Sequence, residues 1–307
     1  MELRQLRVFL VVAEERSFTR AAARLFLAQS AVSAAIRSLE RDLRVSLIDR
    51  STQPIDLTTV GRVFREHALA TVAAADRARA AAKETEGTLQ GTVRLGLLGT
   101  RRVGAISMAS LITTFMDRHP RVTIAAEQVG GSPRQLAAVR DGRLDLAFVS
   151  SQSEHVSGVR LLPLAQEPVA LVCHPAHSLP ETPDIRLVDL VKETFVELPP
   201  DWTCSVVVNR AFARIGLPHE VRYRVNDLTT LADFIVNDFA VTLLPPSPVP
   251  ADPNLRMVPV LDAPVYKVQL ALPIDRVPSA ATRAFCDAIQ DSFSVGSRVD
   301  EASMVFD

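Results

Sequence analysis

Three short runs of helical spacing within the first 43 residues constrain the fold of this chain more than any other feature. Apolar residues from Leu6 to Ala13 follow the i, i+3, i+4, i+7 pattern of a helix with one buried face, which predicts a helix over residues 3–14. An alanine-rich helix follows, and Ser17 or Thr19 can cap its first turn. A third apolar stripe predicts a helix over residues 29–43. We expect the three helices to share one small core.

The second and third predicted helices have the spacing of a helix-turn-helix, in which the later helix presents its N-terminal outer face to the major groove of DNA. If the apolar stripe of the third helix faces inward, its outer face carries short or hydrogen-bonding side chains. These are Gln29, Ser30, Ser33, Ala34 and Arg37. Gln can read adenine, Ser can bond base edges or phosphates, and an Ala methyl can touch thymine. The pattern predicts a DNA-reading helix, and the alternative is a helix face that meets only solvent.

Charge is unevenly distributed along the chain. Residues 1–65 hold eleven Arg and seven acidic residues, a net charge of +4, so the remainder carries −5 of the total of −1. A basic head on an acidic body is typical of a nucleic-acid-binding module joined to a different kind of domain. A basic surface without such a role is the alternative.

A polar turn comes after the third helix. Residues 51–57 separate short extended pieces and predict a hairpin wing, from which Arg50 and Gln53 can reach a phosphate or the minor groove. Thr58 is expected to cap a long alanine-rich helix over residues 59–88. At about 1.5 Å per residue this helix is too long for the small head to bury, so we expect it to pair with a helix of a partner subunit.

A boundary rich in glycine near residue 90 separates this head from a different pattern. Strands are expected at residues 92–98, 122–127, 144–149, 168–173, 194–197, 220–225, 239–244 and 265–272. Helices are expected at residues 102–118, 133–141, 204–215, 228–237 and 278–293. This alternation predicts βαβ units in a mostly parallel sheet. The residues from Ser294 onward show no periodicity and are expected to form a loose tail.

The composition limits the class of protein. A length of 307 residues predicts more than one domain, and 48% hydrophobic with 22% charged residues argues against a disordered or fibrous chain. No uncharged run reaches the roughly 20 residues of a membrane span, and the first residues do not form a secretion signal. The three cysteines, Cys173, Cys204 and Cys286, match no metal or redox spacing. We therefore expect a cytoplasmic protein without a disulfide framework and without a membrane partner.

Several motifs stand together in one order along the chain. They are Leu3-Arg4-Gln5-Leu6-Arg7, Ser17-Phe18-Thr19-Arg20-Ala21-Ala22, Ala28-Gln29-Ser30-Ala31-Val32-Ser33, Ile36-Arg37-Ser38-Leu39-Glu40, Asp49-Arg50, Thr92-Val93-Arg94-Leu95-Gly96 and Asp141-Gly142-Arg143-Leu144-Asp145-Leu146-Ala147. In this order the chain resembles the LysR-type transcriptional regulators over nearly its whole length. It departs from the family pattern at Ser30, where proline is common, and at Ala34 and Ala35, where Arg and Gln are frequent, which implies fewer base contacts. The turn at residues 236–240 also lacks the usual glycine.

The resemblance implies an α+α/β architecture. A winged helix-turn-helix would span residues 1–58, a linker and dimerisation helix residues 59–90, and a periplasmic-binding-protein-like effector domain residues 91–294, followed by a tail at 295–307. The effector domain would consist of two α/β subdomains, the first at about 92–163 and 267–294 and the second at about 164–266. The implied partners are promoter or operator DNA, a small-molecule effector between the subdomains, a homodimer or homotetramer, and RNA polymerase. Arg20 and Arg50 join the outer face of the third helix as candidate DNA contacts.

Candidate effector residues lie where strands end and helices begin, because free N–H groups and the helix dipole favour an anion there. Ser132 opens a predicted helix and forms a capping-box pattern with Gln135, so it is either structural or ligand-binding. The resemblance implies roles for Thr100, Ser150 and Thr203 on the sides of the cleft. Arg101 can pair with a carboxylate, one candidate class of effector, or be a solvated surface residue. The sole tryptophan, Trp202, either faces the ligand or covers the edge of a core.

Other functions have weaker support in the sequence. Cys173, His174 and His177 are metal-ligating types. Pro175 and Pro180, however, break any helix that would align the two histidines, and no third ligand pair lies nearby, so we expect a loop with no metal and no cofactor. No nucleophile motif or phosphate-binding loop is present, which argues against an enzyme that uses the cleft. The principal alternative to a regulator is a cytoplasmic small-molecule-binding protein whose N-terminal helices only dimerise.

Overall fold

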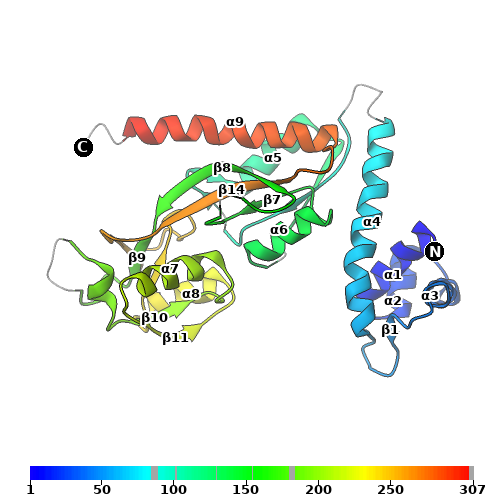
Figure 1. Ribbon diagram of the computed structural model, residues 1–307, viewed down its shortest axis with the longest axis horizontal. Coiled ribbons are helices and arrows are strands. Elements are labelled where there is room, and N and C mark those ends of the chain that lie inside the picture. Colours follow the sequence, from blue (N-terminus) through cyan, green and yellow to red (C-terminus); the bar gives the residue numbers. More distant parts are fainter. Residues whose placement is uncertain (84–88, 101, 129, 154, 180–183, 304–307) are drawn as a thin grey trace. The chain divides into compact units, whose positions relative to one another are not determined.

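The computed structural model describes residues 1–83, 89–100, 102–128, 130–153, 155–179 and 184–303 (Figure 1). The chain divides into an N-terminal unit that ends at residue 87 and a larger C-terminal unit. The N-terminal unit is helical apart from one hairpin, and the C-terminal unit contains mixed helices and sheets.

The N-terminal unit begins with three short helices. These are α1 (Leu3–Glu15), α2 (Phe18–Leu25) and α3 (Gln29–Leu43). Ser17 caps α2, because its hydroxyl oxygen accepts a hydrogen bond from the Arg20 N–H at 3.3 Å. Phe9, Val32 and Ile36 are fully buried between the three helices. The expected shared core is therefore confirmed. The predicted third helix also agrees with α3 at both ends.

A hairpin and a long helix complete the N-terminal unit. Strands β1 (Ile48–Asp49) and β2 (Asp56–Leu57) pair antiparallel and form the predicted wing. Helix α4 (Thr59–Lys83) begins where predicted, since the Thr58 hydroxyl oxygen accepts a hydrogen bond from the Gly61 N–H at 2.9 Å. The predicted end of this helix, at residues 84–88, lies outside the described residues.

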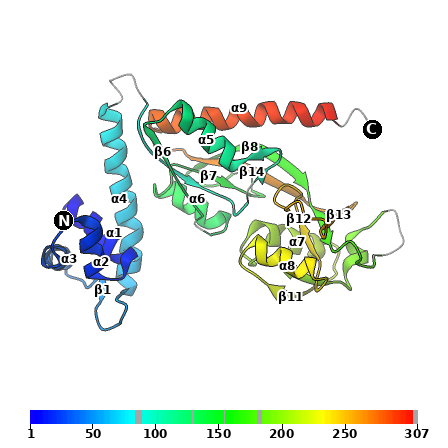
Figure 2. The same ribbon diagram turned by 180° about the vertical axis from the view of Figure 1, so that it is seen from behind.

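The first lobe of the C-terminal unit is built on a five-stranded sheet. Its strand order is β6 (Val122–Glu127), β3 (Gly91–Gly96), β7 (Leu146–Val149), β14 (Val265–Pro273) and β8 (Val159–Pro168). Helices α5 (Met108–Arg118) and α9 (Ala280–Ser303) lie on one face, and α6 (Ser132–Arg140) lies on the other (Figure 2). Strands β6, β3 and β7 are parallel, whereas β14 is antiparallel to both of its neighbours. The expected mostly parallel sheet is thus a mixed sheet.

Two elements of this lobe differ from the sequence prediction. The helix expected at 102–118 begins at Met108, because β4 (Arg102–Val103) and β5 (Ile106–Ser107) form a hairpin that turns through Gly104 at φ 54°. Strand β8 was not predicted, since it contains Pro163 and ends at Pro168. Proline is tolerated there because β8 is an edge strand and its pairing with β14 shifts register at Leu164.

The second lobe contains two small sheets. Strands β12 (Thr242–Leu244), β9 (Ala170–Cys173) and β13 (Arg256–Pro259) form an antiparallel sheet, and β10 (Thr194–Glu197) pairs in parallel with β11 (Glu220–Arg224). Helices α7 (Thr203–Arg214) and α8 (Leu228–Val236) and the short 3₁₀ helix Leu187–Leu190 pack on them. Strand β13 was also not predicted, and the strand expected at 239–244 is limited to β12.

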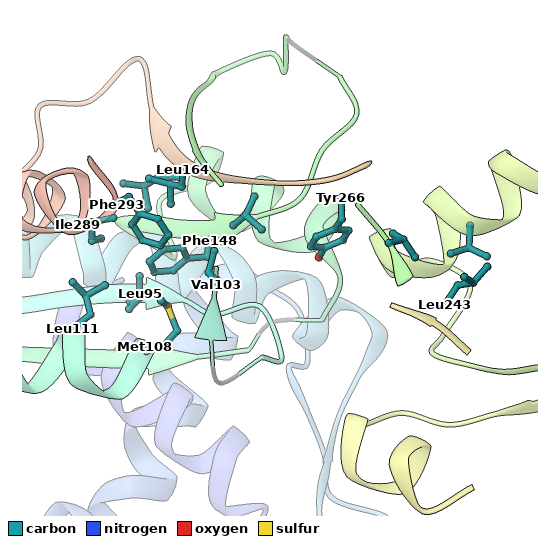
Figure 3. Packing of buried hydrophobic residues seen from close by; sticks show 14 of the residues in the cluster. Leu95, Val103, Met108, Leu111, Phe148, Leu164, Leu243, Tyr266, Ile289 and Phe293 are labelled. Carbon is teal, nitrogen blue, oxygen red and sulfur yellow. The ribbon is translucent and has the colours of Figure 1, made fainter. Parts of the chain in front are cut away.

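Two chain crossings join the lobes of the C-terminal unit. Strand β8 leads into β9, and β14 returns the chain, so both crossings lie in one long antiparallel pair that runs from Val159 opposite Pro273 to Pro168 opposite Val265. Buried side chains of both lobes belong to one apolar cluster, which includes Phe148 of the first lobe and Leu243 of the second (Figure 3). Tyr266 lies on β14 within this cluster and is 5% exposed. The hinge is therefore a packed pair of strands.

The ends of two helices also differ from expectation. The loose tail expected from Ser294 is wrong as far as Ser303, because α9 continues to that residue, and residues 304–307 lie outside the described chain. No proline interrupts this stretch, and the single Gly296 costs only about 1 kcal/mol in a helix. After α8, the turn without glycine is made by Asp238 at φ 54°, a left-handed conformation that Asp tolerates better than most residues.

Candidate functional site

The outer face of α3 has the geometry expected for contact with a groove. Gln29, Ser30, Ala34 and Arg37 are exposed, while Ser33 is half-buried and lies 3.4 Å from the Gln29 amide nitrogen. Val32, Ile36 and Leu39 on the opposite face are fully buried. The structure therefore brings the five predicted contact residues together at the N-terminal end of one helix face.

The other candidate DNA contacts beside this face are one exposed glutamine and arginines that form ion pairs. Gln53 is exposed in the wing. The Arg20 guanidinium lies 3.4 Å from a Glu15 carboxylate oxygen, and the Arg50 guanidinium lies 2.8 Å from Glu40. Arg24, which the sequence analysis did not single out, pairs with both Glu14 and Glu15, and these carboxylates raise the pKa of its guanidinium. Each of these arginines keeps an exposed side chain, so ion pairing orients the charge without burying it.

A cavity that is partly open to solvent lies between the two lobes of the C-terminal unit. Its walls are mainly apolar and come from strand ends and helix starts of both lobes. The lining residues are Leu98, Gly99, Thr100, Arg102, Val103, Gln128, Gly130, Gly131, Ser132, Leu198, Trp202, Thr203, Cys204, Leu228, Leu244, Pro245, Ser247, Pro248, Tyr266 and Val268. Such a concave, mostly apolar site with a few polar groups is typical of a small-molecule site.

Three hydroxyl-bearing residues connect the lobes at one side of the cavity. The Ser132 hydroxyl oxygen accepts a hydrogen bond from the Ser150 N–H at 2.9 Å and lies 3.1 Å from the Thr203 hydroxyl. The Thr203 hydroxyl donates to the Ser150 carbonyl at 2.9 Å. Ser132 and Thr203 are the first residues of α6 and α7, so two helix N-termini meet here. Their free N–H groups and dipoles favour a negative charge at this position.

The capping box expected at the start of α6 is wrong. Gly131 caps the helix through its carbonyl oxygen, which accepts hydrogen bonds from the N–H groups of Arg134 and Gln135. The Gln135 side chain instead donates to the Leu97 carbonyl at 2.6 Å. The Ser132 hydroxyl is thereby left to bridge Ser150 and Thr203, which favours the ligand-binding interpretation of this serine over a purely structural one.

The hydroxyl of the buried Tyr266 and the thiol of the half-buried Cys204 face the same part of the cavity and remain uncharged at neutral pH. Burial raises the pKa of the Tyr266 hydroxyl well above its usual value, and the Cys204 thiol nearby raises it further. Burial also raises the pKa of the Cys204 thiol to about 11. Both groups are therefore neutral hydrogen-bonding groups and not nucleophiles.

The other predicted effector residues have different outcomes. Thr100 lines the cavity, and its hydroxyl donates to the Arg102 carbonyl at 2.5 Å. Trp202 lines the cavity as well, whereas Ser150 is buried behind it. Arg101 lies outside the described residues. The prediction missed Gln128, although it follows strand β6 as Thr100 follows β3, and the rule that ligands collect at strand ends could have found it.

One histidine of the pair near Cys173 joins two segments of the chain through hydrogen bonds. The two ring nitrogens of His177 lie 3.0 Å from Glu193 and 3.0 Å from Asp238, so the ring connects the loop after β9 to the turn after α8. Among the described residues no group of three or more His, Cys, Asp or Glu side chains has the arrangement of a metal site. No helix within the described ranges has the length and apolar character needed to cross a membrane.

The fold and the two sites together define a DNA-binding regulator with a ligand-binding domain. The model of the LysR substrate binding domain matches residues 86–294, and the model of the bacterial regulatory helix-turn-helix protein, lysR family, matches residues 3–62. The chain belongs to the LysR family of transcriptional regulators.

Individual relatives match most of the chain. The HTH-type transcriptional regulator BenM of Acinetobacter baylyi is 29% identical over 87% of this chain and 89% of that protein. The HTH-type transcriptional regulator ShiR of Corynebacterium glutamicum is 34% identical over 74% of this chain and 77% of that protein. Among solved structures, the LysR family transcriptional regulator CbnR has a TM-score of 0.71 at 21% identity and covers 95% of this chain and 99% of its own. The fold of the N-terminal and effector-binding domains is thus shared from end to end.

Proposed function

We propose that this regulator reads DNA with the outer face of α3 and binds its effector in the cavity between the two lobes. The residues proposed to contact base edges are Gln29, Ser30, Ser33, Ala34 and Arg37, and those proposed to contact the backbone or minor groove are Arg20, Arg50 and Gln53. The exposure of the α3 face, and of Arg50 and Gln53 in the wing beside it, supports these assignments. Phosphate contacts by Arg supply affinity that falls with salt, and groove contacts supply sequence choice. We place this binding to DNA in the cytoplasm.

The effector is proposed to be a small carboxylate with an apolar body. The single observation that supports this class is the meeting of two helix N-termini at Ser132 and Thr203, inside an otherwise apolar cavity. Thr100, Ser132 and Thr203 are proposed to hold the carboxylate, with Ser150 behind them and Trp202 against the apolar body. We assign the cavity a binding role, in which the neutral Tyr266 and Cys204 serve as hydrogen-bonding groups.

The hinge provides a route from the cavity to DNA. Glu167 on β8 accepts hydrogen bonds from the Gly104 N–H at 3.0 Å and the Ser247 N–H at 2.9 Å, which belong to different lobes beside the cavity. A ligand that prefers one arrangement of the lobes shifts the population toward that arrangement. In a dimer or tetramer this shift changes the spacing of the DNA-binding heads and the promoter geometry that RNA polymerase meets.

The oligomer is proposed to form through α4. Val60 and Val63 lie three positions apart on this helix and are 49% and 60% exposed, so they form an apolar strip on one helix face. A partner helix would bury such a strip. Paired subunits place two α3 helices in successive major grooves, which matches an operator with two half-sites.

The effector proposal predicts a response of Trp202 fluorescence. A panel of small aromatic and aliphatic monocarboxylates, each with its uncharged amide, is titrated into the full chain. We expect a saturable shift for a carboxylate and not for its amide. Thr203→Val removes one hydrogen-bonding group from the site and is expected to weaken binding about tenfold.

Thr114→Val is the matched control, because it makes the same chemical change on the exposed face of α5. It is expected to leave the titration unchanged. Equal responses to the carboxylate and its amide, or an unaltered affinity in Thr203→Val, would contradict the proposed carboxylate site.

A further inference from the structure

Glu40 in the second half of α3 connects this helix to the base of the wing. One of its carboxylate oxygens accepts hydrogen bonds from the backbone N–H groups of Leu47 at 2.9 Å and Ile48 at 3.1 Å. Ile48 is the first residue of β1, so the carboxylate bonds to the chain at the point where the wing begins. The Glu40 side chain is only 14% exposed, which makes these hydrogen bonds less open to competition from water.

The other oxygen of the same carboxylate holds Arg50. It lies 2.8 Å from a terminal guanidinium nitrogen of Arg50, which follows the last residue of β1. The Arg50 guanidinium also lies over the ring of Phe18, with its carbon 5.6 Å from the ring centre. Phe18 is the first residue of α2, so this contact joins α2, α3 and the wing around one cation.

Arg50 is oriented by these contacts but not buried. Its side chain is 43% exposed, and a guanidinium has five N–H donors in a fixed fork. Donors that do not face Glu40 can bond a phosphate without a search over many rotamers. A guanidinium held in place loses less conformational freedom when it binds than a free one does.

We propose that Glu40 is a positioning residue for DNA binding, which sets the wing on α3 and fixes the Arg50 guanidinium where its exposed donors meet a DNA phosphate. This inference rests on the proposed role of α3 and the wing as the DNA-binding face. It assigns a favourable role to a negative charge on that face, although a negative charge there repels DNA at long range. If Glu40 acted through its charge alone, removal of that charge would therefore strengthen DNA binding.

The test measures the binding of fluorescent duplexes to the full chain across a range of salt concentrations. One duplex carries the region upstream of the chain's own gene, and the other is a shuffled sequence of equal length. Glu40→Gln keeps an oxygen that can accept from Leu47 and Ile48, but it removes the negative charge that holds Arg50. We expect it to weaken binding of both duplexes about tenfold, because a phosphate contact supplies affinity whatever the base sequence.

Arg50→Ala gives the second comparison. Loss of one phosphate contact makes the fall of log K with log salt less steep, by about 0.9 in the magnitude of the slope. We expect this reduction for the upstream duplex in Arg50→Ala and in Glu40→Gln, and no further reduction in the double variant, because both changes remove the same contact. A residue that only stabilised the fold would not change this slope.

Asp42→Asn is the matched control, because it removes one negative charge from the same helix at a residue that pairs with the chain's N-terminal amine and not with the wing. If Glu40→Gln and Asp42→Asn strengthened the binding of both duplexes equally, Glu40 would act only through its charge. That result would overturn this inference but not the proposed role of α3. Additive effects of Glu40→Gln and Arg50→Ala would also overturn it. Equal binding of the two duplexes by the unaltered chain would overturn the proposed role of α3 and this inference with it.

Discussion

Gly61→Ala is expected to destabilise the N-terminal unit by about 3 kcal/mol, the upper part of the usual range for overpacking. A Cβ atom at Gly61 would lie 2.0 Å from the Leu47 carbonyl oxygen and 2.9 Å from its carbonyl carbon. This oxygen cannot move freely, because it accepts a hydrogen bond from the Thr58 N–H at 3.0 Å, and Leu47 itself is fully buried. The start of α4 must therefore separate from the base of the wing.

The sign of this effect distinguishes close packing from helix propensity. In an open helix, Gly→Ala stabilises by about 1 kcal/mol, so propensity alone predicts a more stable protein. The measurement is thermal unfolding of the full chain by calorimetry, with Thr59→Ala as the control at an exposed position of the same helix two residues earlier. A Gly61→Ala protein as stable as the unaltered chain would contradict the close approach of α4 to Leu47.

His219→Phe is expected to destabilise the C-terminal unit by about 3 kcal/mol, as removal of one partner from a buried pair generally does. The imidazole Nε2 lies 2.7 Å from a Glu197 carboxylate oxygen, and the two side chains are 4% and 5% exposed. The ring stacks on Phe212 at 4.2 Å and meets Phe195 edge-on at 4.9 Å. Phenylalanine preserves this packing, so the loss isolates the hydrogen bond to Glu197.

A second variant separates the polar contact from packing. Glu197→Met combined with His219→Phe removes both polar groups and is expected to recover most of the lost stability, because no unpaired carboxylate remains buried. The amide of Asn209, which also approaches Glu197, keeps its hydrogen bond to the Ser205 carbonyl at 2.6 Å. Unfolding in urea measures both variants. An unchanged stability for His219→Phe would show that Glu197 does not depend on the imidazole.

The sequence predicts best where the structure follows from local spacing. Helix α3 agrees with its prediction from Gln29 to Leu43, since its buried residues recur every three or four positions. The edge strand β8 escaped prediction because Pro163 is normally excluded from strands, and only its position beside a register shift accommodates it. The hairpin before α5 escaped because Gly104 is a single residue in an otherwise helix-compatible run.

The residues of the candidate sites also differ in how well the sequence predicts them. Ser132 could be predicted because it opens a helix after a strand, whereas Thr100 and Thr203 were predicted through the family resemblance. The structure brings these three residues and Trp202 to one cavity. Tyr266 is the second residue of strand β14, and nothing in its neighbouring sequence marks it as part of a cavity. Glu40 could not be predicted as a partner of Arg50 either, because ten positions separate them and only the fold of the wing brings them together.

One measurement tests the central claim, that the outer face of α3 reads specific DNA, most directly. Binding of the full chain to the duplex from upstream of its own gene is compared with binding to a shuffled duplex as salt is raised, for the unaltered chain and for Arg37→Ala. The account predicts a preference for the upstream duplex of about a thousandfold or more, with log K falling linearly against log salt. It also predicts that Arg37→Ala reduces this preference. Equal, salt-insensitive binding of the two duplexes, unchanged by Arg37→Ala, would contradict it.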